Sequence, residues 1–232
     1  IQRERTDCWI HQSGISGKNS FYCQEGCRGN KDISALVRFE FGKGNGKLKK
    51  IVYPRAGGVE TIQIVEAEDP SPARGEVCVR VHRAGVNFAE LMMRQGLYGS
   101  SPDYPFTPGY ETAGEVIGLG EGVDSLRKGD RVLAMTGFGG YAEKVCLDAR
   151  RVVKIPDSVS FDQAAAIPVT YGTSYHMLVH LGRMVRGETV LIHHAAGGVG
   201  TAVAQICNAL GASLVIGTAS APKRDFVESL GM

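Results

Sequence analysis

The chain has 232 residues, an apolar fraction of 43% and a formal net charge of +2. This length accommodates one large or two modest domains, and the apolar fraction is sufficient for a packed core. The nearly balanced charge, with no basic stripe of interleaved aromatic residues, argues against nucleic acid as a partner, and no apolar run approaches the ~20 residues of a membrane-spanning helix.

The first part of the chain differs in composition from the rest. Residues 1–46 are rich in Gly, Ser, Asn, Gln and charge and show no sustained hydrophobic periodicity, so we expect a poorly ordered extension. Cys8, His11, Cys23 and Cys27 have the spacing of a weak zinc-ligand pattern, but the residues between them lack the hydrophobic pattern of a small metal domain. We therefore predict no metal site, with zinc at these four residues as the alternative.

Three further cysteines bear on the compartment of the protein. The N-terminus lacks the charged-then-apolar layout of a secretory signal, which favours a cytoplasmic protein. Cys78, Cys146 and Cys207 fall in apolar strand or helix patterns, where a reduced core cysteine is the ordinary state. We therefore predict that these three side chains are buried thiols.

Short alternating β-runs begin at Lys47 and continue to about Asp157. Gly, Pro and Asp clusters separate them, a pattern that is typical of a barrel or a sandwich. We assign residues 47–160 to this β-rich domain. The predicted strands are 50–53, 61–66, 76–84, 114–119, 131–134 and 141–147.

The pattern then changes to that of an α/β domain. Residues 161–180 have helical spacing, and a turn follows them. After this turn come a strand, a glycine-rich turn, a helix and a second strand at 213–218, which together make one βαβ unit. A doubly wound parallel sheet needs several more strands. We therefore predict an incomplete Rossmann domain over residues 161–232, in a chain that is truncated within this domain.

The most informative segment is 189–200, with the sequence TVLIHHAAGGVG. Val190, Leu191 and Ile192 are predicted to form a buried parallel strand, and the apolar residues after the glycines recur at helical spacing. Ala195 stands where the usual G-x-G-x-x-G pattern has its first glycine. The context of strand, glycine turn and helix nevertheless favours a dinucleotide-binding unit over a plain tight turn.

The glycines of this turn have separate expected roles. Gly197 lets the backbone approach a pyrophosphate, and Gly200 lets the helix pack closely against the strand. A helix N-terminus also presents unpaired N–H groups and a positive dipole end to an anion. We therefore expect Gly197, Gly198, Val199 and Gly200 to bind the phosphates of the cofactor.

The second strand of the unit indicates which dinucleotide binds. An NAD-binding unit places Asp or Glu about twenty residues after the glycines, where the carboxylate binds the ribose hydroxyls. This chain has Ala219 and Ser220 there instead, followed by Lys223 and Arg224. A hydroxyl and two cations suit a 2′-phosphate, so NADPH is the predicted cofactor. The alternative is that the two cations are only solvent-exposed residues at the start of a helix.

Five motifs, read with this domain order, resemble the medium-chain dehydrogenase/reductase superfamily. They are most similar to its zinc-free quinone oxidoreductase branch, which includes zeta-crystallin and the synaptic vesicle membrane protein-like members. The resemblance covers about residues 47–232 and implies a GroES-like β-barrel domain, a Rossmann domain and an active site between them. The motifs are AGVNFAELMMRQGLY (84–98), PGYETAGEV (108–116), GDRV (129–132), GGYAEKV (139–145) and AAGGVG (195–200).

The resemblance also assigns roles to single residues. Asn87 matches an asparagine beside the nicotinamide ribose and is a catalytic and cofactor-binding candidate, with a helix cap as the alternative. Tyr98 matches a tyrosine that lines the substrate cleft, and it is our candidate for orienting a carbonyl or donating a proton; a surface-packed tyrosine is the alternative. Thr173 resembles a threonine near the nicotinamide, and Tyr171 is a looser candidate.

The zinc positions of the related alcohol dehydrogenases are altered in this chain. Tyr110 occupies the place of the zinc-binding histidine in a PGHE motif, and a phenol does not replace an imidazole there. The loop between Val132 and Gly139 is short and has no cysteine, whereas a structural zinc lobe carries four. Glu111 is then expected to be a structural carboxylate or a hydrogen-bond partner. In the motif at 84–98, Glu90 stands where the resembled family more usually has Asp. The resemblance thus implies a metal-free catalytic domain.

Without a Lewis acid, quinones and conjugated enones are better substrates than an unactivated alcohol. The sequence therefore predicts NADPH-dependent reduction of such small molecules by hydride transfer. An enoyl thioester reductase and a non-catalytic member that acts by association are the two alternatives. Homodimers are common in the resembled family, so a homodimer is a candidate assembly, although the sequence alone does not define the oligomeric state.

Overall fold

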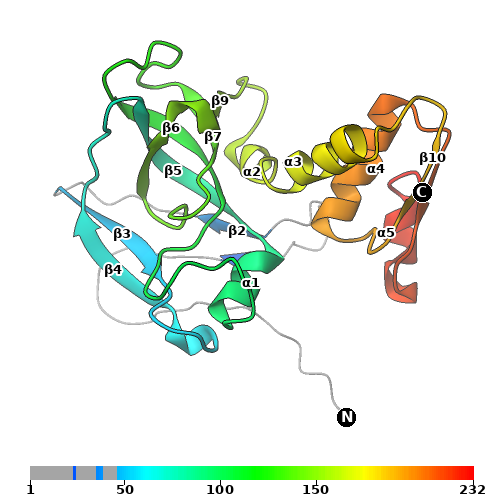
Figure 1. Ribbon diagram of the computed structural model, residues 1–232, viewed down its shortest axis with the longest axis horizontal. Coiled ribbons are helices and arrows are strands. Elements are labelled where there is room, and N and C mark those ends of the chain that lie inside the picture. Colours follow the sequence, from blue (N-terminus) through cyan, green and yellow to red (C-terminus); the bar gives the residue numbers. More distant parts are fainter. Residues whose placement is uncertain (1–22, 25–34, 39–45) are drawn as a thin grey trace. The chain divides into compact units, whose positions relative to one another are not determined.

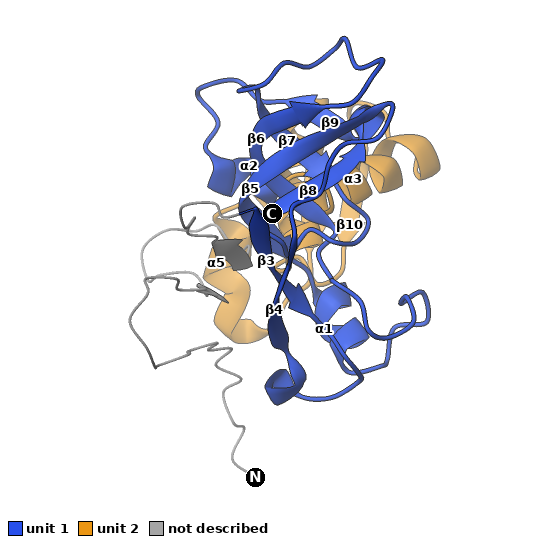
Figure 2. Ribbon diagram, turned by 90° about the vertical axis from the view of Figure 1, so that its left-hand side faces the viewer, with its two compact units in different colours: residues 1–166 blue, residues 167–232 orange. Residues whose placement is uncertain are grey.

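The computed structural model describes residues 23–24, 35–38 and 46–232. The chain divides into two compact units, residues 1–166 and residues 167–232 (Figure 2). The mixed α/β class with a β-rich first part is confirmed. The division falls a few residues after the predicted boundary at 160, because one short helix packs with the first unit.

Strand β5 (Glu76–Val86) is the central element of unit 1. One edge of β5 pairs with β6 (Figure 1), and the other edge pairs first with β8 and then with β2. All these pairs are antiparallel. The other strands of the sheet are β1 (Cys23–Gln24), β2 (Ala35–Arg38), β6 (Glu111–Leu119), β7 (Arg131–Met135), β8 (Lys144–Asp148) and β9 (Val152–Lys154).

The hairpin of β3 (Lys47–Val52) and β4 (Gln63–Glu68) forms a second, two-stranded sheet in unit 1. Lys50 is bridged to Ala142, and Tyr53 to Phe106, so the hairpin is bonded to the loops of the larger sheet. Val77, Val79 and Val81 alternate along β5 and are completely buried. This period of two is the reason that the segment forms a strand with one face in the core.

All six predicted strands of this unit are present, with shifted ends. β4 begins at Gln63 because Val59–Thr61 form a 3₁₀ turn, in which the Thr61 hydroxyl donates to the Gly58 carbonyl. β6 begins at Glu111, earlier than predicted. β9 and the two strands before residue 46 were not predicted, because runs of two to four residues are too short to show alternation.

The prediction of reduced thiols is wrong for Cys78 and Cys146. These residues lie directly opposite each other in the β5–β8 pair and form a disulfide, with Cα atoms 4.1 Å apart. Each cysteine looked like a core residue of its own strand, and the sequence did not show that the strands are neighbours in this register. Cys207 is buried and free, as predicted, and burial raises the pKa of its thiol.

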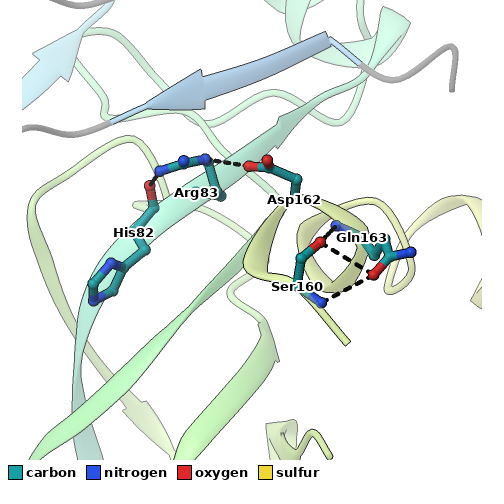
Figure 3. A network of polar contacts seen from close by, with 5 residues as sticks. All are labelled: His82, Arg83, Ser160, Asp162 and Gln163. Carbon is teal, nitrogen blue, oxygen red and sulfur yellow. Dashed lines mark hydrogen bonds and ion pairs between the residues drawn. The ribbon is translucent and has the colours of Figure 1, made fainter. Parts of the chain in front are cut away.

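The short helix α2 (Phe161–Ala165) is bonded to the sheet of unit 1 by aromatic and ionic contacts. The Phe161 ring stacks on His82 with centroids 4.5 Å apart, and the guanidinium of Arg131 lies 4.7 Å from the same ring. Arg83 on β5 donates to Asp162 on α2, as Figure 3 shows beside the capping box of this helix. These contacts explain why α2 belongs to the first unit.

Unit 2 contains the predicted βαβ unit. β10 (Thr189–Ile192) and β11 (Leu214–Gly217) pair in parallel, and α4 (Gly198–Leu210) connects them. Helix α3 (Thr170–Tyr175) precedes them and continues as a π-helical turn, η3 (His176–Leu181). A 3₁₀ turn, η4 (Ala221–Lys223), and helix α5 (Arg224–Glu228) follow β11.

The expectation of a strand buried on both faces is wrong for β10. Ile192 and Val215 are buried in the core with α4, but Leu191 is 57% exposed, and Leu214 and Ile216 are exposed on β11. Side chains of a strand alternate between the two faces of the sheet. In the described part of the chain, elements cover only the face that carries Ile192.

Most of the predicted extension, residues 1–46, lies outside the described residues, and so do Cys8, His11 and Cys27 of the zinc-ligand pattern. Only the backbone of Cys23 is described. Among the described residues, no helix combines the length and the apolar character needed to cross a bilayer.

Replacing Phe161 with alanine tests the attachment of α2. We expect Phe161→Ala to lower the free energy of unfolding by about 1–3 kcal/mol, because it removes the ring between His82 and Arg131. Urea unfolding followed by circular dichroism measures the change. Phe161→Leu, which keeps most of the apolar volume, is expected to lose less. Equal stability of the alanine variant and the wild type would contradict this account.

Candidate functional site

The glycine turn joins the end of β10 to the start of α4. The N–H of Ala195 donates to the Thr218 carbonyl at 3.0 Å, and the N–H of Thr218 donates to the Ile192 carbonyl at 2.8 Å. The N–H of Gly197 donates to the His194 carbonyl at 2.9 Å, and His194 itself has a positive φ of 55°. The turn is thus hydrogen-bonded to the carboxyl end of β11.

Gly200 and Gly197 differ in what surrounds them. A Cβ atom on Gly200 would lie 2.6 Å from the backbone of Ala195, so only glycine allows α4 to approach the turn this closely. A Cβ atom on Gly197 would meet only the His194 carbonyl, at 3.3 Å, and the φ of Gly197 is −86°. Substitution at Gly200 is therefore incompatible with the fold, whereas the fold accepts a side chain at Gly197 with a small adjustment.

The N-terminus of α4 supplies donors for an anion. The first bond of the helix runs from the N–H of Thr201 to the Gly197 carbonyl, at 2.9 Å. The N–H groups of Gly198, Val199 and Gly200 precede it, so they have no acceptor within the helix. Three adjacent donors at the positive end of a 13-residue helix fit the diphosphate of a dinucleotide.

Ser174, which the sequence analysis did not identify, connects α3 to this turn. Its hydroxyl is completely buried and lies 2.7 Å from the Thr170 carbonyl and 3.1 Å from the Val199 carbonyl. Thr173, the residue of α3 that precedes Ser174, is exposed. The Tyr171 hydroxyl donates to Gln205 at 2.8 Å. The only signal in the sequence was that this serine directly follows the site candidate Thr173.

The residues expected to bind a 2′-phosphate follow β11. Ser220 precedes η4, and its carbonyl accepts from the N–H of Lys223 at 2.8 Å. Arg224 and Glu228 form an exposed ion pair with a distance of 2.7 Å. No ion pair of the described residues includes Lys223, whose side chain is exposed. Ser220 and Lys223 therefore fit a phosphate directly, whereas Arg224 first has to leave Glu228.

In unit 1, Asn87 is the N-cap of α1 (Phe88–Arg94), the role given above as its alternative. Its amide Nδ2 donates to Oε1 of Glu111 at 2.9 Å. The carboxylate of Glu90 accepts from the Asn87 N–H at 2.8 Å and from the Tyr110 N–H at 3.1 Å. The Asn87 side chain is therefore already engaged within unit 1, and its predicted contact with the cofactor stays a prediction.

Two buried carboxylates lie behind this cap. Glu90 is 1% exposed and Glu111 is 2% exposed. Burial raises the pKa of Glu90, although its hydrogen bonds with backbone N–H groups oppose the shift. A Cβ atom on Gly85 would lie 2.2 Å from Oε1 of Glu111, so β5 makes room for that carboxylate with a glycine. The structural role predicted for Glu111 agrees with this packing.

Aromatic side chains lie beside the cap. Tyr98 and Phe138 are each 37% exposed, and the rings of Tyr110 and Phe138 have centroids 5.3 Å apart. Burial and a hydrogen bond with the Tyr98 side chain raise the pKa of Tyr110 to about 12. Both phenols therefore lie together in unit 1, and Tyr110 keeps its proton at neutral pH.

The donor set at this position does not fit zinc. A zinc ligand offers a lone pair as a thiolate, a carboxylate or a neutral imidazole. Tyr110 is a protonated phenol, and in the described ranges no three His, Cys, Asp or Glu side chains are grouped as a metal site. Glu90 and Glu111 accept hydrogen bonds from the protein instead.

The comparisons with known proteins agree with the fold. Residues 73–157 match the family model described as the alcohol dehydrogenase GroES-like domain. In this chain a domain of this kind precedes a βαβ unit with a glycine turn. The chain therefore belongs to the medium-chain dehydrogenase/reductase superfamily, in its quinone oxidoreductase branch.

Individual relatives support this placement. The chain is similar to the human synaptic vesicle membrane protein VAT-1 homolog, with 40% identity over 187 residues, which are 80% of this chain and 48% of that protein. It is also similar to the crystal structure of Escherichia coli quinone oxidoreductase complexed with NADPH, with a TM-score of 0.73, 34% identity and coverage of 78% of this chain and 56% of that one. The CurK enoyl reductase structure has a TM-score of 0.75, 31% identity and coverage of 80% and 58%. The chain thus spans about half the length of the curated relatives that it matches.

The raised pKa of Glu90 predicts a pH-dependent stability. Because the folded pKa lies above the ordinary value of 4.5, the folded state holds this proton more tightly than the unfolded state. The contribution of Glu90 to stability is complete below 4.5 and is lost as the pH rises through the folded pKa. As the pH rises through the folded pKa of Glu90, we expect the free energy of unfolding of Glu90→Gln to increase by about 0.5–1.5 kcal/mol relative to that of the wild type.

Urea unfolding of both proteins at a series of pH values measures this difference. Glu66→Gln, at an exposed carboxylate of β4, is the matched control and is expected to show no such trend. A difference between Glu90→Gln and the wild type that stays constant with pH would disprove the assignment.

Proposed function

We propose that the chain is part of an NADPH-dependent oxidoreductase that reduces quinones or conjugated enones by hydride transfer without zinc. The observation that carries this proposal is the α4 N-terminus, where three N–H groups have no acceptor within the helix, together with the absence of an acidic residue from the positions directly after β11. The NADPH complex named for the E. coli quinone oxidoreductase supports the choice of cofactor. When bound, NADPH supplies the hydride.

In this proposal, different residues of unit 2 bind different parts of the cofactor. Gly197, Gly198, Val199 and Gly200 bind the diphosphate, and Ser220 and Lys223 bind the 2′-phosphate, with Arg224 as a further cation. An Asp or Glu at Ala219 would repel that phosphate, and its absence favours NADPH over NADH. Thr173 is the proposed contact for the nicotinamide end, beside Ser174 on α3.

The residues of unit 1 would orient the acceptor. The half-exposed rings of Tyr98 and Phe138 suit a flat, conjugated molecule. Tyr110 stays protonated and hydrogen-bonds with Tyr98, so this pair of phenols offers a proton to an oxygen that gains negative charge. Quinones and enones delocalise that charge, so one neutral hydroxyl gives sufficient help without a metal. Asn87 is the proposed contact for the nicotinamide ribose of the cofactor.

A second candidate function is the reduction of an enoyl thioester. The similarity to the CurK enoyl reductase favours it, because reducing a conjugated thioester requires a hydride and a proton, as reducing an enone does. Side-by-side turnover of a quinone and an enoyl thioester separates the two. A cytoplasmic location remains our prediction, and a homodimer remains a candidate assembly.

Substitution at Gly197 tests the cofactor site. Gly197→Val is expected to fold, because its Cβ would meet only the His194 carbonyl, and to abolish NADPH binding, because its side chain occupies the approach to the N–H groups. Nicotinamide fluorescence during an NADPH titration measures binding, and circular dichroism checks folding. Gly99→Val, where nothing lies within 4 Å of an added Cβ, is the matched control. Unchanged NADPH affinity of a folded Gly197→Val variant would refute the site.

Removal of the two hydroxyls tests the roles of the tyrosines. We expect Tyr98→Phe to lower kcat/KM for a quinone by about 100-fold, because the donor to the substrate oxygen is lost. Tyr110→Phe is expected to lose less, since its hydroxyl acts through Tyr98. Tyr175→Phe, an exposed tyrosine of α3, serves as the control. Stopped-flow oxidation of NADPH measures the rates, and equal activity of Tyr98→Phe and the wild type would exclude the role.

A further inference from the structure

The disulfide between Cys78 and Cys146 lies outside the residues assigned to cofactor and substrate. We propose that it is a thiol-exchange site, at which a small carboxylate-bearing thiol of the glutathione class forms a mixed disulfide with Cys146. The position of the pair in the sheet, the unequal exposure of the two cysteines and the lysine of the adjoining groove carry this proposal. It does not depend on the proposed oxidoreductase activity.

The hydrogen-bond pattern places the two cysteines at a non-hydrogen-bonded position. The N–H of Val81 donates to the Glu143 carbonyl at 2.9 Å, and the N–H of Ala149 donates to the Gly75 carbonyl at 3.0 Å. Hydrogen-bonded and non-hydrogen-bonded pairs alternate along an antiparallel ladder, so Cys78 and Cys146 lie at a position without such bonds, where side chains approach more closely. Opening the disulfide therefore breaks no backbone hydrogen bond of its own pair.

The two sulfurs differ in access. Cys78 is 2% exposed, whereas Cys146 is only partly buried and lines a groove of about 230 Å³. The Pro70 carbonyl lies 3.6 Å from Sγ of Cys78 and is an acceptor for its thiol once the disulfide opens. A thiol from solvent therefore reaches Cys146, and the buried partner already has a hydrogen-bond acceptor.

One unpaired cation lies in the groove. Lys144 is neutralised by its ion pair with Asp69, and no ion pair of the described residues includes Lys50. Glu68 also belongs to the lining, but it pairs with Lys47, so its side chain lies on the other face of the β3–β4 pair from Lys50. Lys50 thus offers a partner for a carboxylate. This is the reason for choosing a carboxylate-bearing thiol over a neutral one.

The exchange takes place in two steps, each with one thiol. The thiolate of the incoming thiol attacks Sγ of Cys146, a new S–S bond forms there, and the bond to Cys78 breaks. The electron pair leaves on Sγ of Cys78, which takes up the proton that the incoming thiol released. A second thiol then attacks the mixed disulfide, so two thiols are oxidised to one disulfide while Cys78 and Cys146 are reduced.

The test uses the full chain with Cys8, Cys23, Cys27 and Cys207 replaced by serine, so that only this pair reacts. The oxidised protein is incubated with glutathione, the reaction is stopped with acid, and peptide mapping by mass spectrometry locates the mixed disulfide. Circular dichroism confirms that the protein stays folded. We expect at least about tenfold more adduct on Cys146 than on Cys78. Equal adducts, or a pair that glutathione leaves intact in the folded protein, would overturn the proposal.

The charge of the groove is tested separately. We expect Lys50→Met to slow the reaction with glutathione by about two- to fivefold and to leave the rate with 2-mercaptoethanol unchanged. Lys128→Met, a lysine outside the groove lining, is the matched control. If Lys50→Met slows the reactions of both thiols equally, the selectivity for carboxylate-bearing thiols is refuted. Cys78→Ser, which leaves Cys146 as the only thiol of the pair, is expected to form a stable adduct with oxidised glutathione, and failure to do so in a folded variant would contradict the accessibility of Cys146.

Discussion

The approach of α4 to the backbone of Ala195 is the constraint on which the candidate cofactor site depends. Gly200 permits it, since an added Cβ would lie 2.6 Å from that backbone. The approach directs the first N–H groups of α4 toward the turn and brings Val199 within hydrogen-bonding distance of Ser174. The donors are thus held by the packing of backbone on backbone, and no flexible side chain has to be ordered when the diphosphate binds to them.

In unit 1, too, a glycine permits a close contact that a side chain would prevent. Gly85 leaves room on β5 for the carboxylate of Glu111, which in turn accepts from the amide of Asn87. The second buried carboxylate, Glu90, binds the backbone at the start of α1 and at Tyr110. A protein whose zinc position carries a phenol therefore still keeps its acidic side chains in place, as hydrogen-bond acceptors that position Tyr110 for the proposed chemistry.

The local elements of the fold could be predicted from the sequence, because they depend on neighbours along the chain. The alternation of Val77, Val79 and Val81 and the order of β10, the glycine turn and α4 are of this kind. Pairings between distant segments could not be predicted. The register that brings Cys78 opposite Cys146, and the exposure of Leu191, are set by which strands become neighbours. In the candidate site, the motifs located Asn87 and Tyr98, but they did not show that Asn87 is bonded to Glu111 or that Tyr110 lies beside Tyr98.

The central claim is that this chain binds the phosphates of NADPH through the α4 N-terminus and the residues after β11. The most direct measurement is the ratio of the dissociation constants of NADH and NADPH for this chain, determined by isothermal titration calorimetry at one ionic strength. The account predicts that NADPH binds more tightly by about tenfold or more, because Ser220 and Lys223 contact the 2′-phosphate and Ala219 does not repel it. Equal affinities, or tighter binding of NADH, would contradict it.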